Sequence, residues 1–163
     1  MNNRKKITLY LAQGAMIAAI YVAITMVLAP ISFGHIQLRV SEALTILPVF
    51  TPAAIPGLFV GALISNTLAQ GVLLDIIFGS LASLIAAIGT YYLRKRNKFF
   101  APIPPILVNA LIIPFVLRYG YGLPFPITFM MLTVGLGQVL SAGVLGMFLY
   151  SAVDKSKKHI FKM

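Results

Sequence analysis

The sequence has no cysteine and no tryptophan, and only three of its 163 residues are acidic, namely Glu42, Asp75 and Asp154. The absence of cysteine excludes disulfides, thiolate metal sites and cysteine nucleophiles. Charged residues make up only 10% of the chain, whereas soluble globular domains carry roughly 25%. The chain is therefore not an ordinary soluble domain, and each carboxylate in it needs a physical reason, because burying an unpaired charge is costly.

Apolar residues dominate the sequence. They make up 60% of the sequence, and the mean hydropathy is +0.95, values that place the chain in a membrane. A membrane-spanning helix takes about 20 residues, so six spans use roughly 120 residues and leave only short loops. We therefore predict one membrane domain over residues 1–163, with short basic tails at about 1–6 and 154–163 and no separate soluble domain.

The apolar runs predict an all-α membrane protein with six transmembrane helices. The second helix is the unusual one, because it is capped by Ser41 and broken or kinked at Pro48 and Pro52. It reaches only about 20 Å against a bilayer core of about 30 Å, so we expect neighbouring helices to enclose it partly. The expected segments are Ile7–Ala29, Glu42–Ala54, Pro56–Leu73, Asp75–Leu93, Pro102–Leu117 and Ile127–Val153.

Basic residues gather in three clusters that flank apolar runs. Cytoplasmic loops of membrane proteins are enriched in Lys and Arg, so the pattern indicates a multi-pass protein of the plasma membrane with both termini in the cytoplasm. It explains the net charge of +10 better than nucleic-acid binding does. In this orientation, only Arg39 and Arg118 of the thirteen Lys and Arg residues are expected on the outer side of the membrane. The clusters are Arg4, Lys5 and Lys6; Arg94, Lys95, Arg96 and Lys98; and Lys155, Lys157, Lys158 and Lys162.

Small residues form a ladder on the first predicted helix. Ala15, Ala19 and Ala23 recur at every fourth position and share one stripe, with Gly14 and Ala18 beside it. Such a stripe lets another helix approach closely. Two interpretations stay open, namely packing inside this protein's own bundle and docking onto a different membrane protein.

Polar residues are concentrated where the orientation places the outer side. Gln37, Arg39 and Glu42 stand close together in residues 34–48, and Asp75 opens the fourth predicted helix. This grouping predicts one wall of a small-molecule site that is open to the exterior. Two simpler explanations remain, because Glu42 can pair locally with Arg39, and a helix N-terminus favours an acidic residue such as Asp75.

Five segments of the chain resemble a known family, over nearly the whole length and in the same order. They are GAMIAAIYVAIT, IQLRVSEALTILPVF, GLFVGALISN, DIIFGSLASLIAA and LVNALII, and the family is the queuosine-precursor family of substrate-binding (S) components of energy-coupling factor (ECF) transporters. The resemblance implies the six-helix S-component bundle, which captures a 7-deazaguanine precursor of queuosine from outside. It also implies three partners, a transmembrane coupling protein and two cytosolic ATPases. The chain has no phosphate-binding P-loop motif of its own.

The implied ligand can be matched to the polar residues. A deazaguanine presents an N–H and an amino group on one edge, a carbonyl acceptor nearby and a flat ring, which carboxylates, amides and aromatic rings can bind. The amides can instead tie helices together by hydrogen bonds. The candidate substrate-binding residues are Gln37, Arg39, Glu42, Asn66, Asp75, Asn109 and Gln138, and the candidate stacking residues are Phe33, Tyr119 and Tyr121.

The resemblance also bears on partners and chemistry. The alanine motif of the family matches Ala15, Ala19 and Ala23, which implies docking onto the coupling protein. The sequence departs from the family at Gln138, where a Glu is usual, and at Pro114, where a Gly is commoner. A missing Glu removes one acceptor charge from the pocket and puts in doubt which precursor is preferred.

We expect no enzymatic activity in this chain. No nucleophile with an adjacent base, close pair of carboxylates or metal-ligand cluster stands out in the sequence. We therefore expect no catalytic residue, no metal site and no cofactor, ATP being used by the partner ATPases. Two alternatives to the leading interpretation are an S component for a different vitamin or nucleobase, and a non-transporting membrane anchor subunit.

Overall fold

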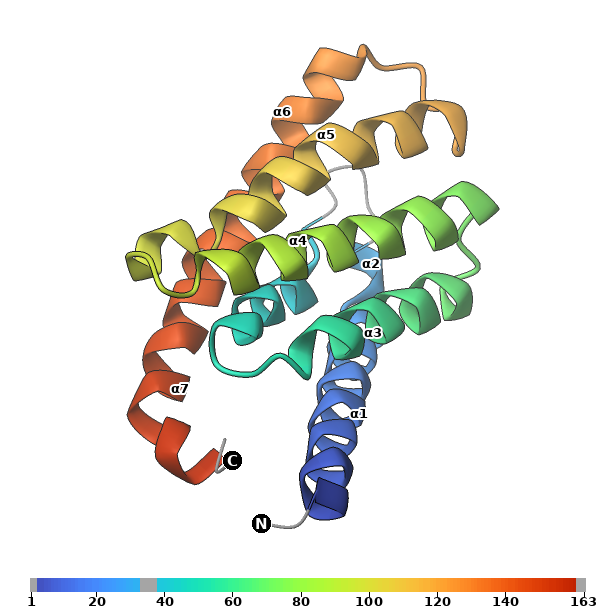
Figure 1. Ribbon diagram of the computed structural model, residues 1–163. Helices are drawn as coiled ribbons and strands as arrows, with labels where there is room; N and C mark the ends of the chain where they lie inside the picture. The colour runs from blue at the N-terminus through green and yellow to red at the C-terminus, as the bar shows by residue number, and fades with distance from the viewer. Residues whose placement is uncertain (1–2, 33–37, 161–163) are drawn as a thin grey trace.

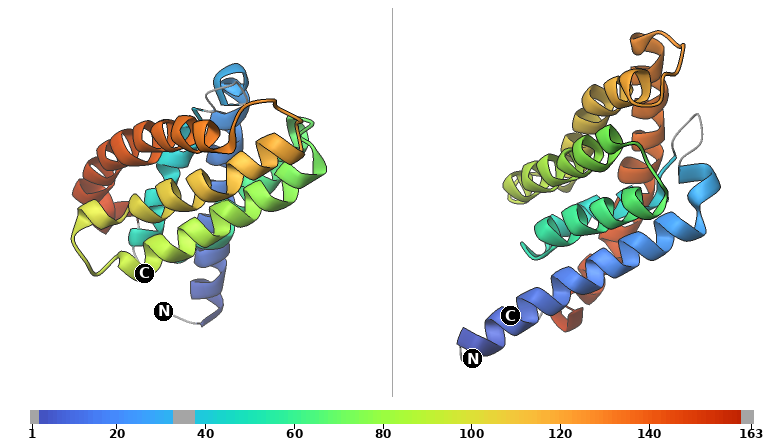
Figure 2. Two further views of the ribbon diagram at one scale, coloured as in Figure 1. Left: turned by 90° about the horizontal axis from the view of Figure 1, so that it is seen from above. Right: turned by 90° about the vertical axis from the view of Figure 1, so that its right-hand side faces the viewer.

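The computed structural model describes residues 3–32 and 38–160, without the side chains of 157–160, and every element in these ranges is helical. Figures 1 and 2 show α3, α4 and α5 stacked side by side, with α1 across one side of the stack and α6, η4 and α7 forming one continuous helix on the other. The elements are α1 (Asn3–Val27), α2 (Ala29–Ser32), η1 (Val40–Val49), α3 (Ala54–Leu68), η2 (Asp75–Gly79), α4 (Ser80–Leu93), η3 (Lys98–Phe100), α5 (Ile103–Tyr119), α6 (Ile127–Gln138), η4 (Val139–Leu145) and α7 (Gly146–Ile160).

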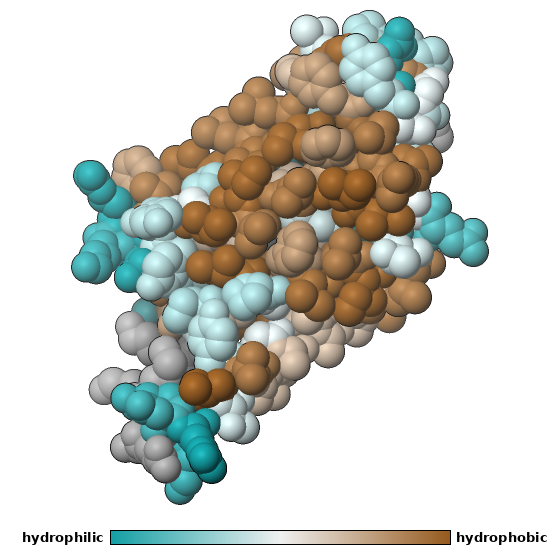
Figure 3. All heavy atoms as spheres, turned by 45° about the vertical axis from the view of Figure 1, so that its right-hand side comes forward, coloured by the Kyte–Doolittle hydropathy of each residue, from teal (hydrophilic) through white to brown (hydrophobic). Residues whose placement is uncertain are grey.

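Within the described residues, four helices are long and apolar enough to cross a membrane. They are Asn3–Val27, Asp75–Leu93, Lys98–Tyr119 and Ile127–Ser156, and two shorter apolar helices, Val40–Val49 and Ala54–Leu68, accompany them. Figure 3 shows a broad hydrophobic band on one face, with hydrophilic residues at its margins. The prediction of an all-α membrane protein is confirmed, while the count of six spans stays a prediction.

The two ends of the bundle differ in charge. In the right-hand view of Figure 2, the first turn of α1 and the α4–α5 connection lie at one end, and α2, the α3–η2 connection and the α5–α6 connection lie at the other. The first end carries the basic clusters at residues 4–6 and 94–98, and we call it the basic end. The last helix runs towards it from the opposite end. The helices α1 and α7 include much of the predicted basic tails, because they begin at Asn3 and end at Ile160.

The seam between α1 and α3 is built from small residues. A Cβ on Gly57 would lie 2.6 Å from the carbonyl oxygen of Gly14, and a Cβ on Gly61 would lie 2.9 Å from the Cβ of Tyr21. Glycine is required at both positions because the helix backbones approach too closely for any side chain. This seam holds the middle of α1 against α3 and so fixes the position of the Tyr21 side chain.

The short helix η1 differs from the predicted second helix. It is a 3₁₀ helix over Val40–Val49, with Pro48 inside it, and it ends before Pro52 rather than at Ala54. Ser41 does not cap it, because its hydroxyl lies 2.6 Å from the hydroxyl of Thr25 on α1 and the N-cap residue is Arg39. Most of its residues are buried, which confirms that neighbours enclose it. At about 2.0 Å per residue, a 3₁₀ helix of this length spans roughly 20 Å.

The ends of other predicted helices were wrong by up to about two helical turns. The helix α3 ends at Leu68 instead of Leu73, because Gln70 takes a left-handed conformation with φ 55° and turns the chain away. The fourth helix opens with the π-helical segment η2, and the last helix contains η4 in its middle and continues past Val153. Both π-helical segments begin at or directly after a polar residue of the predicted site, Asp75 and Gln138.

Candidate functional site

The Glu42 carboxylate is held by two other helices. Glu42 is 2% exposed. The Tyr21 hydroxyl on α1 donates to Oε1 at 2.5 Å, and the Asn109 amide on α5 donates to Oε2 at 3.4 Å. Asn109 also donates to the carbonyl oxygen of Pro105 one turn earlier, at 3.0 Å, which orients its side chain. We call Tyr21, Glu42 and Asn109 the Glu42 group; it ties η1, α1 and α5 together.

The Asp75 carboxylate belongs to a second group, made of Asn66, Asp75 and Tyr121. Asp75 is 1% exposed, and the Tyr121 hydroxyl donates to its Oδ2 at 2.9 Å. The Asn66 amide on α3 donates to the backbone carbonyl of Asp75 at 3.1 Å. We call these residues the Asp75 group; they join α3, η2 and the α5–α6 connection.

A glycine makes room for the Asp75 group. A Cβ on Gly79 would lie 2.7 Å from Oδ1 of Asp75 and 2.9 Å from the amide nitrogen of Asn66. Because these distances are shorter than real Cβ contacts, any larger residue at position 79 would push both side chains away. The family-like segment DIIFG therefore supplies the carboxylate together with the space that it needs.

Tyr121 is the most exposed member of the two groups. Its side chain is 38% exposed, although its hydroxyl reaches the buried carboxylate. Partial burial and the negative charge of Asp75 raise the pKa of Tyr121 to about 12. The hydroxyl is therefore a proton donor at any physiological pH.

Arg39 connects the two groups electrostatically. It is 8% exposed and lies within electrostatic reach of both Glu42 and Asp75. The simple local pair of Arg39 with Glu42 is thus only part of the arrangement, because Glu42 is also held from α1 and α5. One buried cation facing two buried carboxylates compensates for much of their cost of burial.

Two buried amide oxygens have no hydrogen-bond partner within the described part of the chain, Oδ1 of Asn66 and Oε1 of Gln138. Asn66 is 0% and Gln138 is 5% exposed. Buried polar atoms are nearly always hydrogen-bonded to protein, water or ligand. These two oxygens are therefore candidate acceptors for N–H groups of a bound molecule.

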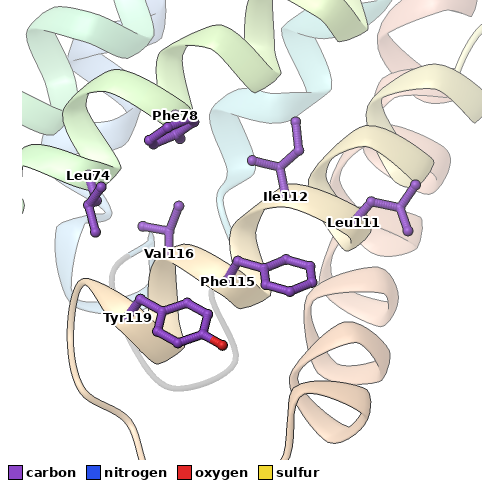
Figure 4. Close-up of a pocket in the computed structure, with 7 residues that line it drawn as sticks. All are labelled: Leu74, Phe78, Leu111, Ile112, Phe115, Val116 and Tyr119. Carbon is purple, nitrogen blue, oxygen red and sulfur yellow. The ribbon is translucent and has the colours of Figure 1, made fainter.

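The predicted stacking residues Tyr119 and Tyr121 lie in different surroundings. Tyr121 belongs to the Asp75 group, whereas Tyr119 is 71% exposed and its ring stacks on Phe115 at 6.5 Å and 12°. Figure 4 shows the rings of Tyr119 and Phe115 at an apolar surface pocket, which has a volume of about 290 Å³ and also includes Leu74 and Phe78. Stacking of Tyr119 on a buried ligand is not favoured by this arrangement. Phe33 and Gln37 lie outside the described residues, so their predicted roles stay predictions.

The structure separates the small residues of α1 into two faces. Gly14 and Ala18 are buried, and Gly14 packs against α3. Ala15, Ala19 and Ala23 are all exposed. The two interpretations of the stripe therefore apply to different residues, internal packing to the first pair and an available docking face to the alanine ladder.

Tyr21, a member of the Glu42 group, was not among the site residues predicted from the sequence. It is 0% exposed and is the largest fully buried side chain of the described residues. A signal was present, because a tyrosine in the middle of an apolar helix carries a hydroxyl that needs a partner. In a chain with three acids, one of those carboxylates was a natural partner to test.

Comparisons with known proteins identify the family of the chain. Residues 11–155 match the model of the QueT transporter family. The chain is also 41% identical over 73 residues to a protein of Lactococcus lactis subsp. cremoris named queuosine precursor transporter QueT, and this match covers 44% of the chain and 43% of that protein. No solved structure matches the chain significantly. Since the family model covers most of the sequence, the chain belongs to the QueT transporter family, a family of transporters rather than enzymes.

Proposed function

We propose that this chain is the substrate-binding (S) subunit of an ECF-type importer that captures a queuosine precursor, a 7-deazaguanine base, from outside. Family membership supports transport, and the name of the Lactococcus lactis relative supports the class of substrate. The observation that carries the proposal is the pair of linked polar groups around Glu42 and Asp75 in a chain with only three acids. Ionisable side chains inside a membrane bundle are costly and rare, and they usually mark a functional site.

The unpartnered acceptors suit the donors of a deazaguanine. The oxygens of Asn66 and Gln138 can accept from the amino and ring N–H groups of the base. Asp75 can accept two such bonds when Tyr121 turns away from it. Glu42 already accepts from Tyr21 and Asn109, so in this proposal it orients Asn109 and shapes the site.

The orientation of the chain in the membrane follows from charge. Lys and Arg are retained on the cytoplasmic side of membrane proteins, so the basic end faces the cytoplasm and the Asp75 group faces the exterior. The chain then lies in the plasma membrane as a multi-pass protein with both termini cytoplasmic. A ligand enters near the α3–η2 and α5–α6 connections, which lie at the outer end (Figure 2).

The alanine ladder is the docking face for a transmembrane coupling protein, which acts with two cytosolic ATPases. Ala15, Ala19 and Ala23 are exposed, and small side chains let a partner helix lie close to α1. We predict that Ala19→Trp abolishes co-purification with the coupling protein and leaves ligand affinity within twofold of wild type. Co-purification at wild-type yield would contradict this assignment, and Leu132→Trp, at an exposed position on α6, is the control.

The proposal as a whole is tested by ligand identification. The purified protein is denatured, and the released small molecules are identified by mass spectrometry. We expect a 7-deazaguanine, and we expect calorimetry with the same compound to give saturable binding that guanine reproduces only weakly. Recovery of a different base or vitamin would replace the substrate, and a chain that binds none of these compounds would favour a membrane anchor.

A further inference from the structure

An apolar groove runs along the side of the bundle, away from the Glu42 and Asp75 groups. It has a volume of about 570 Å³, within the range of roughly 300–1,000 Å³ that ligand sites occupy. Its walls are α1 and α7 and its floor is η1. The lining residues are Leu9, Ala12, Gln13, Met16, Ile17, Ile20, Ile24, Val40, Ala43, Leu44, Leu47, Leu149 and Val153.

One polar side chain, that of Gln13, lies among these apolar residues. Its Oε1 accepts a hydrogen bond from the Thr51 hydroxyl at 2.9 Å, while its Nε2 is buried without a partner in the described part of the chain. Gln13 follows the lining residue Leu9 by about one helical turn, so its unpartnered donor belongs to the wall of the groove near the basic end. An occupant that carries an acceptor near that end would satisfy it.

The groove opens towards positive charge. Lys5 and Lys6 are exposed and precede the lining residue Leu9 by about one helical turn, so they stand beside the groove at the basic end. Asp154, the acid nearest in sequence to the groove on α7, has an interaction of its own. A long apolar channel with cations at its membrane-interface end matches an acyl chain that is joined to an anionic headgroup.

We propose that this groove binds one acyl chain of an anionic phospholipid, whose phosphate contacts Lys5 and Lys6 and whose ester carbonyl accepts from Gln13. The site is independent of substrate binding and of the alanine ladder, so the proposal goes beyond the proposed function. In this proposal the bound lipid bridges α1 and α7, which lie on either side of η1 (Figure 1).

The test is native mass spectrometry of the purified chain, titrated with phosphatidylglycerol or with phosphatidylcholine of the same acyl chains. We expect one phosphatidylglycerol to bind at least about fivefold more tightly than phosphatidylcholine. The double variant Lys5→Gln, Lys6→Gln should reduce this preference to less than twofold. The matched control is Lys95→Gln, Lys98→Gln, which removes the same charge from the α4–α5 connection and should keep the preference.

A second variant tests the groove itself. Ala12 is an exposed lining residue, so Ala12→Trp should fill the groove without disturbing the core, lowering the affinity for both lipids at least about fivefold at an unchanged melting temperature. Equal binding of the two lipids, a preference that survives in the Lys5, Lys6 variant, or undiminished binding to Ala12→Trp would each overturn the proposal. So would a lipid-free dimer that Ala12→Trp dissociates, since a second copy would then occupy the groove.

Discussion

The Glu42 and Asp75 groups contain the same chemistry, a buried carboxylate that accepts from a tyrosine hydroxyl, but they differ in what holds the tyrosine. Tyr21 is 0% exposed and sits in the middle of α1, whereas Tyr121 is 38% exposed and sits in the short α5–α6 connection. Moving Tyr21 would require α1 to leave α3. Moving Tyr121 requires only a rearrangement of a connection.

This difference assigns separate tasks to the two carboxylates. The α5–α6 connection contains Gly122 at φ +66°, a conformation that glycine adopts without strain. We therefore expect the connection to lift Tyr121 from Asp75 without opening the bundle, so that in the proposed function Asp75 is the carboxylate that a ligand reaches. Glu42 is the anchor that ties η1 to α1 and α5, and in the proposed function it keeps these helices in place around the ligand.

The largest loss of stability and of ligand binding is expected from substitutions at Glu42, the anchor. Glu42→Ala leaves the Tyr21 hydroxyl without its acceptor and Arg39 without one of its charge partners, and breaking a buried charged network costs roughly 3–5 kcal/mol. The melting temperature in detergent should fall sharply and ligand binding should be lost. Glu42→Gln, which keeps the shape, should weaken binding at least about tenfold, or about 1.4 kcal/mol. Unchanged affinity in Glu42→Gln would show that the charge of Glu42 plays no part in the site.

Asp75→Asn should separate binding from stability. Asparagine keeps one acceptor for Tyr121 and fits beside Gly79, so we expect little change in melting temperature. Ligand affinity should fall at least about tenfold, because a charged acceptor is replaced by a neutral one. Calorimetry and thermal unfolding on the same preparation make the comparison with Glu42. A large loss of stability at unchanged affinity would exchange the roles of the two groups.

Replacing the two tyrosines tests the comparison most directly. Tyr121→Phe removes one hydrogen bond from an exposed connection, so we expect association and dissociation of the ligand to accelerate by about twofold to tenfold, with a small change in stability. Tyr21→Phe, the same change at the anchor, should instead lower stability by roughly 1.5–3 kcal/mol, because the lost bond goes to a buried charged group. Stopped-flow binding and thermal unfolding distinguish these outcomes. Identical behaviour of the two variants would remove the distinction between the Asp75 group and the Glu42 group.

The smallest expected effect is that of pH, because the contribution of the Tyr121 hydroxyl to ligand dissociation should not depend on it near neutrality. The pKa of Tyr121 is raised to about 12, so the protonated hydroxyl is favoured in the folded protein. Its contribution is complete below the ordinary tyrosine pKa of about 10 and is lost only as the pH rises through the folded value. The ratio of wild-type to Tyr121→Phe dissociation rates should therefore stay constant between pH 7 and 9. A ratio that rises towards one between pH 7 and 9 would mean that Tyr121 loses its proton, and with it the hydrogen bond to Asp75, at a lower pH than expected.

Composition and segment order were enough to predict the class of fold and most of the polar network. The scarcity of acids singled out Glu42 and Asp75, and amides in apolar spans singled out Asn66 and Asn109. In the structure Asn109 donates to the carboxylate of Glu42, and Asn66 donates to the backbone carbonyl of Asp75. Tyr21 was missed because its contact with Glu42 depends on how η1 lies against α1, which no local pattern encodes. The exposure of Tyr119 has a similar origin, since it depends on the rotation of α5 about its axis.

Helix boundaries were harder to predict, and the physical reason is the same in each case. The conformation of η1 depends on enclosure by its neighbours, and Gln70 ends α3 in a left-handed conformation for which glycine and asparagine are the usual signals. The π-helical segments leave no mark in hydrophobic periodicity, because they change the hydrogen-bond pattern of only one turn.

The π-helical segment η4 makes this protein sensitive to length as well as to side chains. A π turn holds one residue more than an α turn, and successive residues of an α-helix are about 100° apart around its axis. Deleting a single residue from Val139–Leu145 would let the turn relax to an ordinary helix and would keep the orientation of α7, whereas deleting one residue from the α-helical part before it would rotate α7 by about that angle. In the second case Leu149 and Val153 would turn away from η1, so the place of a one-residue deletion in the last helix decides how far this side of the molecule is disturbed.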